Sequence, residues 1–208
     1  MTYDIRPMGD RALLVTTPNP ASLATAICGL RLDGVTEAVP AAETVLIRFD
    51  PTCNRSNLRR AINELDDLPA TTNSRTHVVI PVTYDGEDLD DVANACGIDV
   101  AEVIAIHCAP TYTVAFCGFA PGFAYLSGLD PRLTVSRMST PRPRVRAGAV
   151  AIADRWSAVY PRESPGGWRL LGTTTMSLFD LSRTQPAALK PGDTVQFTPV
   201  TSVTTSRP

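Results

Sequence analysis

The 208-residue chain has almost no lysine: Lys190 is its single lysine, and the other 18 of its 19 basic residues are arginines. Lysine chemistry such as a Schiff base would have to use this one residue, which lies in a turn beside Pro191. Histidine is scarce too, with only His77 and His107. A zinc site needs Cys or His ligands paired at short spacing, so we expect no metal and five reduced thiols. The cysteines are Cys28, Cys53, Cys96, Cys108 and Cys117.

Long apolar runs and a strong net charge are also missing. No run approaches the roughly 20 residues of a membrane-spanning helix. The first ten residues have neither the apolar core nor the cleavage site of a signal peptide. The formal net charge is −2, so no overall field draws the chain to nucleic acid or to an acidic membrane. We therefore expect a cytoplasmic globular protein that binds neither nucleic acid nor membranes.

The first third of the chain has the pattern of a small α/β domain. Strands are expected at residues 12–17, 35–39, 44–49 and 77–82, and helices at 21–30 and from Asn54 or Ser56 to Leu65. This β-α-β-β-α-β order predicts a ferredoxin-like domain, although the last strand could belong to either side of the boundary. Residues 66–75, rich in Thr, Asn and Pro, predict a linker. We therefore expect domains at 1–76 and 77–208.

Seven carboxylates and no basic residue lie between Asp85 and Glu102. Two short helices account for most of this charge, because Asp88 precedes the first, Gly97 ends it, and Asp99 can cap the second. From Pro110 onward, short β-prone runs alternate with expected turns at PGF, PRL, PRPR, SPGG and PGD. Many short strands of this kind predict a compact β-barrel from about residue 77. The fold class is therefore α+β.

Three segments of the second domain combine aromatic side chains, bare backbone and guanidinium groups: 118–133, 140–153 and 160–174. Each could be structural, since SPGG is a turn pattern. Together they predict a pocket for a small polar molecule. Its candidate substrate-binding residues are Phe119, Pro121, Gly122, Phe123, Tyr125, Arg142, Gly148, Tyr160, Pro165, Gly166, Gly167 and Trp168.

Basic charge gathers in the same region. Residues 130–169 hold eight arginines and only three acidic residues. Arg142 and Arg144, two apart on an extended segment, can point the same way and form an oxyanion site. The alternative is that they are surface charges or ion-pair partners of the acidic stretch. Arg144 is thus a candidate catalytic residue.

His107 is the other candidate catalytic residue. It ends the second short helix, where the helix dipole favours a protonated imidazole. The alternative is a structural residue that bonds the last carbonyls of the helix. The sequence contains no GxSxG nucleophile motif, no GxxxxGK[ST] phosphate loop and no GxGxxG motif.

These segments carry a family resemblance. GFAPGFAYLSGLDPRL, TPRPRV, AGAVAIA, SPGGW, LLGTT and KPGD, with GDRALLV near the start, resemble the 5-oxoprolinase B-subunit family, also called allophanate hydrolase subunit 1. This family includes a sporulation-kinase inhibitor and a domain of biotin-dependent urea carboxylase. The resemblance implies that the second domain is a cyclophilin-like β-barrel.

The resemblance also implies a partner-dependent enzyme. Family members pair with the cyclophilin-like C subunit of 5-oxoprolinase. Together with the A subunit they open the lactam of 5-oxo-L-proline to L-glutamate, using ATP bound by the complex. The chain alone is then expected to be inactive. Two alternatives stay open: a regulatory inhibitor of a sensor histidine kinase, and a component of urea or allophanate metabolism.

Two stretches depart from the family pattern. The family usually has Pro-Ala-Gly-Ser where this chain has Arg146 to Ala149, and Gly-x-Gln-Thr-Gly where it has Asp154 to Ala158. A hydroxyl, an amide and two glycines are lost. These departures bear on the identity of the substrate more than on the fold.

Overall fold

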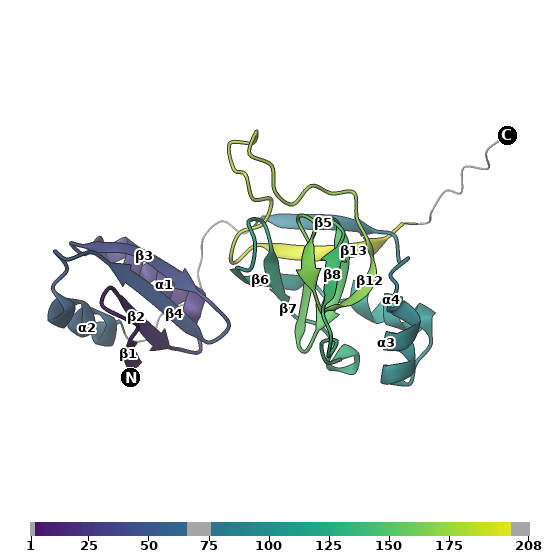
Figure 1. The fold of residues 1–208 in the computed structure, drawn as a ribbon, viewed down its shortest axis with the longest axis horizontal. Coiled ribbons are helices and arrows are strands. Elements are labelled where there is room, and N and C mark those ends of the chain that lie inside the picture. Colours follow the sequence, from purple (N-terminus) through teal and green to yellow (C-terminus); the bar gives the residue numbers. More distant parts are fainter. Residues whose placement is uncertain (1–2, 66–75, 201–208) are drawn as a thin grey trace. The chain divides into compact units, whose positions relative to one another are not determined.

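The computed structural model describes residues 3–65 and 76–200. The chain folds into two compact units, Met1–Ser74 and Arg75–Pro208, which are described separately (Figure 1). The linker expected at residues 66–75 lies outside the described residues. None of the described helices is long and apolar enough to cross a membrane. The five cysteines are free thiols.

The first unit is a four-stranded antiparallel sheet with two helices, and the strand order is β1-β2-β4-β3. Its elements are β1 (Asp4–Pro7), β2 (Ala12–Thr16), α1 (Pro20–Leu30), β3 (Val35–Pro40), β4 (Thr44–Phe49) and α2 (Arg55–Glu64). The three expected strands before residue 50 and both expected helices are confirmed, with small shifts at their ends.

Local sequence explains these elements. Along β4, Val45, Ile47 and Phe49 are buried while the residues between them are not, because alternate side chains of a strand face opposite sides of a sheet. At the start of α2, the Asn54 side chain accepts hydrogen bonds of 3.1 Å from the backbone N–H groups of Ser56 and Asn57. Of the two expected caps, Asn54 is therefore the one used.

The ferredoxin-like arrangement is not confirmed, because its fourth strand is missing from this sheet. The expected strand is β5 (His77–Val82), and it pairs in parallel with β13 (Thr194–Pro199) in the second unit. The place beside β2 is taken by β1, which the sequence pattern did not predict. β1 is four residues long, ends in a proline and buries no residue fully, so it lacks the apolar alternation of a strand.

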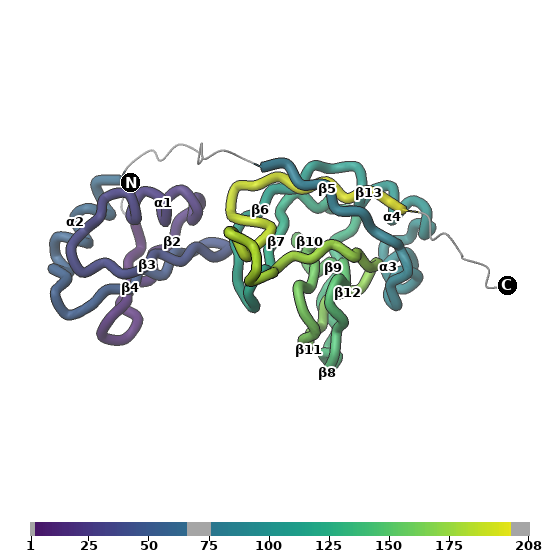
Figure 2. Tube along the Cα trace, turned by 90° about the horizontal axis from the view of Figure 1, so that it is seen from above, coloured from purple at the N-terminus to yellow at the C-terminus, as the bar shows by residue number. Residues whose placement is uncertain are grey.

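The second unit is built on a seven-stranded sheet of order β12-β9-β10-β7-β6-β13-β5 (Figures 1 and 2). A bridge between Thr83 and Thr173 joins its two edges, with 2.8 Å hydrogen bonds in both directions. The sheet is therefore nearly closed, and the expected β-barrel is present in this form. The further strands are β6 (Tyr112–Cys117), β7 (Ala124–Ser127), β9 (Ala149–Ala153), β10 (Trp156–Val159) and β12 (Arg169–Thr173).

Two glycines allow the edges of the sheet to meet. A Cβ atom on Gly172 would lie 2.3 Å from the carbonyl oxygen of Thr83, and one on Gly86 would lie 2.2 Å from that of Leu170. Gly86 and Asp88 donate backbone hydrogen bonds to β12 just beyond the bridge. The segment after β5 can thus run along β12 only because neither glycine has a side chain.

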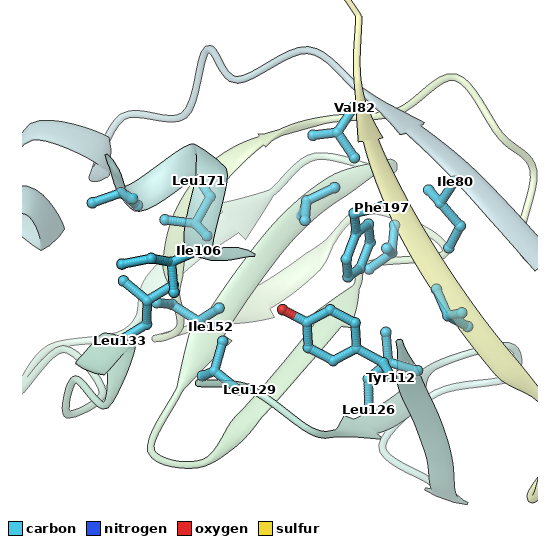
Figure 3. Close-up of a cluster of buried hydrophobic side chains, with 14 of the residues drawn as sticks. Ile80, Val82, Ile106, Tyr112, Leu126, Leu129, Leu133, Ile152, Leu171 and Phe197 are labelled. Atoms are coloured by element: carbon cyan, nitrogen blue, oxygen red, sulfur yellow. The ribbon is translucent and has the colours of Figure 1, made fainter. Parts of the chain in front are cut away.

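The core of the second unit fills the inside of the curved sheet. Side chains from β5, β6, β9, β12 and β13 converge there with Ile106, and the hydroxyl of Tyr112 points inward (Figure 3). The expected pair of helices is confirmed as α3 (Leu89–Cys96) and α4 (Val100–Cys108). Gly97 ends α3 with φ 69°, and Asp99 caps α4 through the N–H of Glu102 at 2.7 Å.

A two-stranded ribbon extends from the sheet at one side. It consists of β8 (Arg142–Val145) and β11 (Ser164–Gly166), which pair antiparallel and project away from the seven-stranded sheet (Figure 2). The turns expected at PRPR and SPGG are therefore wrong, because both segments are strands of this ribbon. The turn expected at PRL is a short 3-10 helix, η1 (Pro131–Leu133).

Candidate functional site

A hollow at the base of the β8–β11 ribbon gathers most of the aromatic side chains singled out in the sequence. Its volume is about 520 Å³, part of it open to solvent. We call it the aromatic pocket. It is lined by Phe119, Phe123, Tyr125, Arg137, Pro141, Tyr160, Pro165, Gly166, Gly167 and Trp168.

The structure brings eight of the twelve expected substrate-binding residues into this lining and leaves four out. Pro121, Gly122, Arg142 and Gly148 do not line the pocket. Two of these are glycines with positive φ, Gly122 at 82° and Gly148 at 80°, which shape turns elsewhere. Conversely, the pocket lining contains Arg137 and Pro141, neither of which was among the expected binding residues. The RPR pattern drew attention to its own arginines and away from the isolated Arg137.

The pocket walls are aromatic rings packed edge to face. The ring of Phe123 lies 5.2 Å from that of Phe119, 5.3 Å from that of Tyr160 and 5.7 Å from that of Trp168, centre to centre. Tyr125 of β7 packs against Trp168 at 5.6 Å. Such edge-to-face contacts fix ring orientations, so the walls are rigid surfaces on which a flat molecule can lie.

Phe119 stands out among these rings. Its φ is +66°, a conformation that is strained for a bulky residue, and 60% of its surface is exposed. A tight turn imposes this backbone, with Ala120 N–H donating to Gly118 at 2.7 Å and Phe123 N–H donating to Ala120 at 3.0 Å. Strain of this kind, about 1–3 kcal/mol, is often found at ligand sites. The exposed ring is thus held at the mouth of the pocket.

Gly166 is needed for a close contact and not for a turn. A Cβ atom there would lie 2.2 Å from the hydroxyl oxygen of Tyr160. Gly166 has no positive φ, and in the SPGG segment it pairs with Arg142 across the ribbon. The expectation that SPGG glycines serve a turn is therefore corrected: this glycine lets the ribbon approach Tyr160.

Arg142 is an ion-pair partner of the acidic stretch, which was the alternative interpretation of the TPRPR segment. Its guanidinium lies 2.7 Å from Asp88 and 3.4 Å from Glu87. The Asp88 carboxylate is buried and also accepts the backbone N–H of Leu170 at 2.7 Å. Asp88 precedes α3, as predicted, but its side chain makes no capping hydrogen bond and instead ties the ribbon to β12. The ion pair raises the pKa of Arg142 further, since the hydrogen bond to Asp88 favours the charged form.

Arg144 does not share a pocket with Arg142. Its side chain is 80% exposed and lies 3.5 Å from Glu163, in a separate polar hollow that also contains Arg146. Arg146 in turn pairs with Asp85 at 3.4 Å. The expected convergence of two guanidinium groups on one site is therefore wrong.

Arg137 has a different environment. Among the described residues its side chain has no ion-pair or hydrogen-bond partner, and it is exposed at the pocket. The neighbouring Met138 N–H donates a 2.7 Å hydrogen bond to the carbonyl of Gly167, which fixes this segment against the pocket wall. Burial raises the pKa values of Tyr125 and Tyr160, and the charge of Arg137 partly opposes both shifts. The guanidinium of Arg137 and the hydroxyls of Tyr125 and Tyr160 therefore face the same pocket.

His107 lies in the core and not in the pocket. It has no exposed surface, and its ring stacks on Phe197 at 4.5 Å. Burial lowers its pKa to about 3, so the expected protonated imidazole at the helix end is wrong. Its ring nitrogens bond Tyr84 at 2.7 Å and Ser157 at 3.0 Å. A substrate would have to enter the packed core to reach it.

The pocket is suited to binding and poorly suited to acid–base chemistry. Its lining contains no carboxylate, imidazole, thiol or serine hydroxyl. No group of three or more His, Cys, Asp or Glu among residues 3–65 and 76–200 could hold a metal ion. Flat apolar walls with one unpaired guanidinium favour a small, flat anion.

Part of each departure from the expected family pattern lies behind the pocket. Ala149, Ala158 and Trp156 belong to, or pack against, the buried cluster that contains Phe123, Tyr160 and Trp168. None of the three lines the pocket. These substitutions can therefore shift the walls without contacting a ligand.

Comparison with known proteins relates most of the chain to one family. Residues 3–189 match the family described as carboxyltransferase domain, subdomain C and D. The chain is 35% identical over 204 residues to the B subunit of 5-oxoprolinase from Escherichia coli O157:H7, covering 92% of this chain and 94% of that protein. The protein of the same name from Haemophilus influenzae is 35% identical over 205 residues, covering 93% and 96%.

Longer proteins contain a similar part. Urea amidolyase of Saccharomyces cerevisiae is 30% identical over 170 residues, which is 74% of this chain and 9% of that protein. Among solved structures, TTHA0988 superposes with a TM-score of 0.80 and 37% identity, covering 92% of this chain. The chain spans only 40% of the length of the TTHA0988 chain.

Proposed function

Because the chain belongs to the family of carboxyltransferase domains, subdomains C and D, we propose that it is one subunit of an ATP-dependent 5-oxoprolinase. In this reaction the lactam of 5-oxo-L-proline is opened to L-glutamate. Phosphoryl transfer from ATP to the lactam oxygen would make the ring carbon open to attack by water, with release of ADP and phosphate. The proposed place of the reaction is the cytoplasm.

The observation that carries this proposal is the near full-length similarity to two proteins named as the B subunit of 5-oxoprolinase. The alignments cover more than nine tenths of this chain and of each relative, so the two units together correspond to almost the whole length of those proteins. The aromatic pocket is compatible with a small lactam that bears a carboxylate. Its size, flat walls and unpaired guanidinium suit such a molecule.

Partners are part of the proposal. The pocket lining offers no base to activate water, and the sequence has no phosphate loop of the common types. The relatives are named as subunits, which supports a complex, and in TTHA0988 the matching part belongs to a longer chain. We propose the cyclophilin-like C subunit and the A subunit of 5-oxoprolinase as these partners. ATP is then a substrate of the complex.

Urea or allophanate chemistry is the second candidate, favoured by the similarity to part of urea amidolyase. The test is ADP release by the purified chain, alone and reconstituted with the A and C subunits, on 5-oxoproline, urea or allophanate. We expect ADP release on 5-oxoproline by the complete complex only. Turnover by the isolated chain would contradict the partner requirement, and turnover restricted to urea or allophanate would replace the substrate.

A further inference from the structure

Arg137 is unusual among the eight arginines of residues 130–169. Five of them pair with carboxylates: Arg132, Arg142, Arg144, Arg146 and Arg169. Arg155 lies over the ring of Trp156 at 5.0 Å. Within this span, and among the residues that the structure describes, only Arg137 and Arg162 have side chains without a hydrogen-bond or ion-pair partner. Of these two, only Arg137 lines the aromatic pocket.

The backbone next to Arg137 is fixed by hydrogen bonding, whereas its guanidinium makes no hydrogen bond or ion pair with the described residues. Met138, the next residue, bonds Gly167 through its N–H, and the Arg142 guanidinium also reaches the sulfur of Met138. Arg142 is itself fixed by the buried Asp88. A buried carboxylate thus anchors the segment that presents Arg137, which lowers the entropy that binding would otherwise cost.

We propose that Arg137 binds the carboxylate of a small cyclic substrate whose ring lies between the aromatic walls of the pocket. A guanidinium donates two parallel hydrogen bonds to a carboxylate, and both partners stay charged. A five-membered lactam ring presents CH₂ groups and a planar amide, which suit the flat faces of Phe119, Tyr125 and Trp168. The inference rests on the proposed function for its choice of 5-oxoproline as this ligand.

The proposal makes the carboxylate, and not the amide, the group that selects the ligand here. Urea has no carboxylate and would gain nothing from Arg137. The matched probe is 2-pyrrolidone, which has the same lactam ring as 5-oxoproline but no carboxylate. Arg142 and Asp88 are positioning residues in this scheme, since they act on the pocket through the 137–141 segment.

Binding to the full chain can be followed at the two tryptophan indole N–H signals by NMR. Trp168 lines the pocket, whereas Trp156 packs behind Tyr125 and serves as an internal reference. We expect 5-oxoproline to shift the Trp168 signal and to bind at least about tenfold more tightly than 2-pyrrolidone, the effect of one charge-assisted hydrogen-bonded pair. Arg137→Gln should abolish this preference while leaving 2-pyrrolidone binding unchanged.

The control is Arg162→Gln, which removes the same charge from an exposed arginine of the same unit outside the pocket lining. It should keep the preference for 5-oxoproline. The proposal is wrong if Arg137→Gln keeps that preference, or if neither the chain nor the reconstituted complex binds 5-oxoproline. It is equally wrong if Arg137→Gln blocks assembly of the complex and leaves ligand preference intact, since Arg137 would then face a partner protein.

The reconstituted complex separates this inference from the proposed function. If the complex hydrolyses 5-oxoproline and Arg137→Gln leaves its KM unchanged, the inference fails and the function stands. If the complex does not act on 5-oxoproline but the chain still prefers the carboxylated lactam through Arg137, the function fails and the carboxylate site stands. A rise of about tenfold or more in KM in Arg137→Gln, with Arg162→Gln unchanged, supports both.

Discussion

The Nε2 atom of His107 lies 3.0 Å from the hydroxyl oxygen of Ser157, and neither side chain has exposed surface. The Ser157 hydroxyl is also 3.4 Å from the carbonyl oxygen of Ala151, to which it can donate. Nε2–H then donates to Ser157, and Nδ1 accepts the hydroxyl of Tyr84 at 2.7 Å. This arrangement uses a neutral imidazole, in agreement with a pKa lowered by burial. A Ser–His pair that looks catalytic is therefore a bridge between α4 and β10 inside the core.

Stability should fall as the pH is lowered, because of His107. Its pKa is about 3 in the folded protein and 6.5 when unperturbed, so between these values the unfolded state binds the extra proton. The free energy of unfolding then decreases by up to about 1.4 kcal/mol for each pH unit that the pH falls. Other titratable groups add their own contributions. Urea unfolding at pH 7 and pH 5 measures this. His107→Gln should be less stable at pH 7 and show a smaller loss at pH 5.

The other histidine provides the control. His77 is exposed at the start of β5, where its ring contacts Thr194, so His77→Gln makes the same substitution outside the core. If the free energy of unfolding falls equally between pH 7 and pH 5 in His77→Gln and His107→Gln, burial does not keep His107 neutral.

Arg142 and Arg144 lie two residues apart on β8 and should differ sharply in their contribution to stability. Arg142→Ala leaves the buried Asp88 carboxylate without its 2.7 Å partner, and removing one partner of a buried pair typically costs about 3–5 kcal/mol. Arg144→Ala breaks only an exposed pair with Glu163, worth about 0–1 kcal/mol. Chemical denaturation of both variants checks this. Similar losses in the two would mean that the Asp88–Arg142 pair does not hold the ribbon.

Gly166 and Gly167 are adjacent in sequence but should respond differently to alanine. In Gly166→Ala the new methyl group would meet the Tyr160 hydroxyl at 2.2 Å, so Tyr160 or the ribbon must move, at a cost of about 1–3 kcal/mol. In Gly167→Ala the nearest atom is the carbonyl oxygen of Met138 at 3.4 Å, which is close to an ordinary contact. We expect a lower melting temperature and weaker ligand binding for the first variant only. A stable Gly166→Ala variant that binds normally would mean that Tyr160 is not held against this glycine.

Much of the secondary structure follows from the sequence because its causes are local. The alternation of Val45, Ile47 and Phe49 predicts a half-buried strand. The side chains of Asn54 and Asp99 cap the helices that directly follow them. By contrast, β1 has no apolar alternation of its own and is a strand because it pairs with β2, so its own residues do not identify it. The SPGG segment was wrongly predicted as a turn, because glycines that suit a turn also permit close packing within a strand.

For the site, the residue types of three segments predicted a pocket, but they did not predict that Arg137 is its charged residue. Eight aromatic, proline and glycine residues of the expected set line it, because their segments lie in one unit and are apolar or backbone-rich. The sequence could not show which arginines pair with carboxylates and which line the pocket. A guanidinium at the end of a long side chain pairs with whatever carboxylate folding brings near, and Asp88 is 54 residues from Arg142.

The sequence by itself therefore determined the family, the two α-helices described in each unit, the strands at residues 12–17, 35–39, 44–49 and 77–82, and the aromatic character of the pocket. These depend on neighbouring residues, whose spacing is fixed by the covalent chain. Only the tertiary structure decided that β5 joins β13 and that Thr83 meets Thr173 to close the sheet. It also decided that Arg142 pairs with Asp88, whereas Arg137 lines the aromatic pocket with no pairing partner among the described residues. Those outcomes depend on which distant segments pack together, and burial and charge pairing across such contacts are properties of the whole fold.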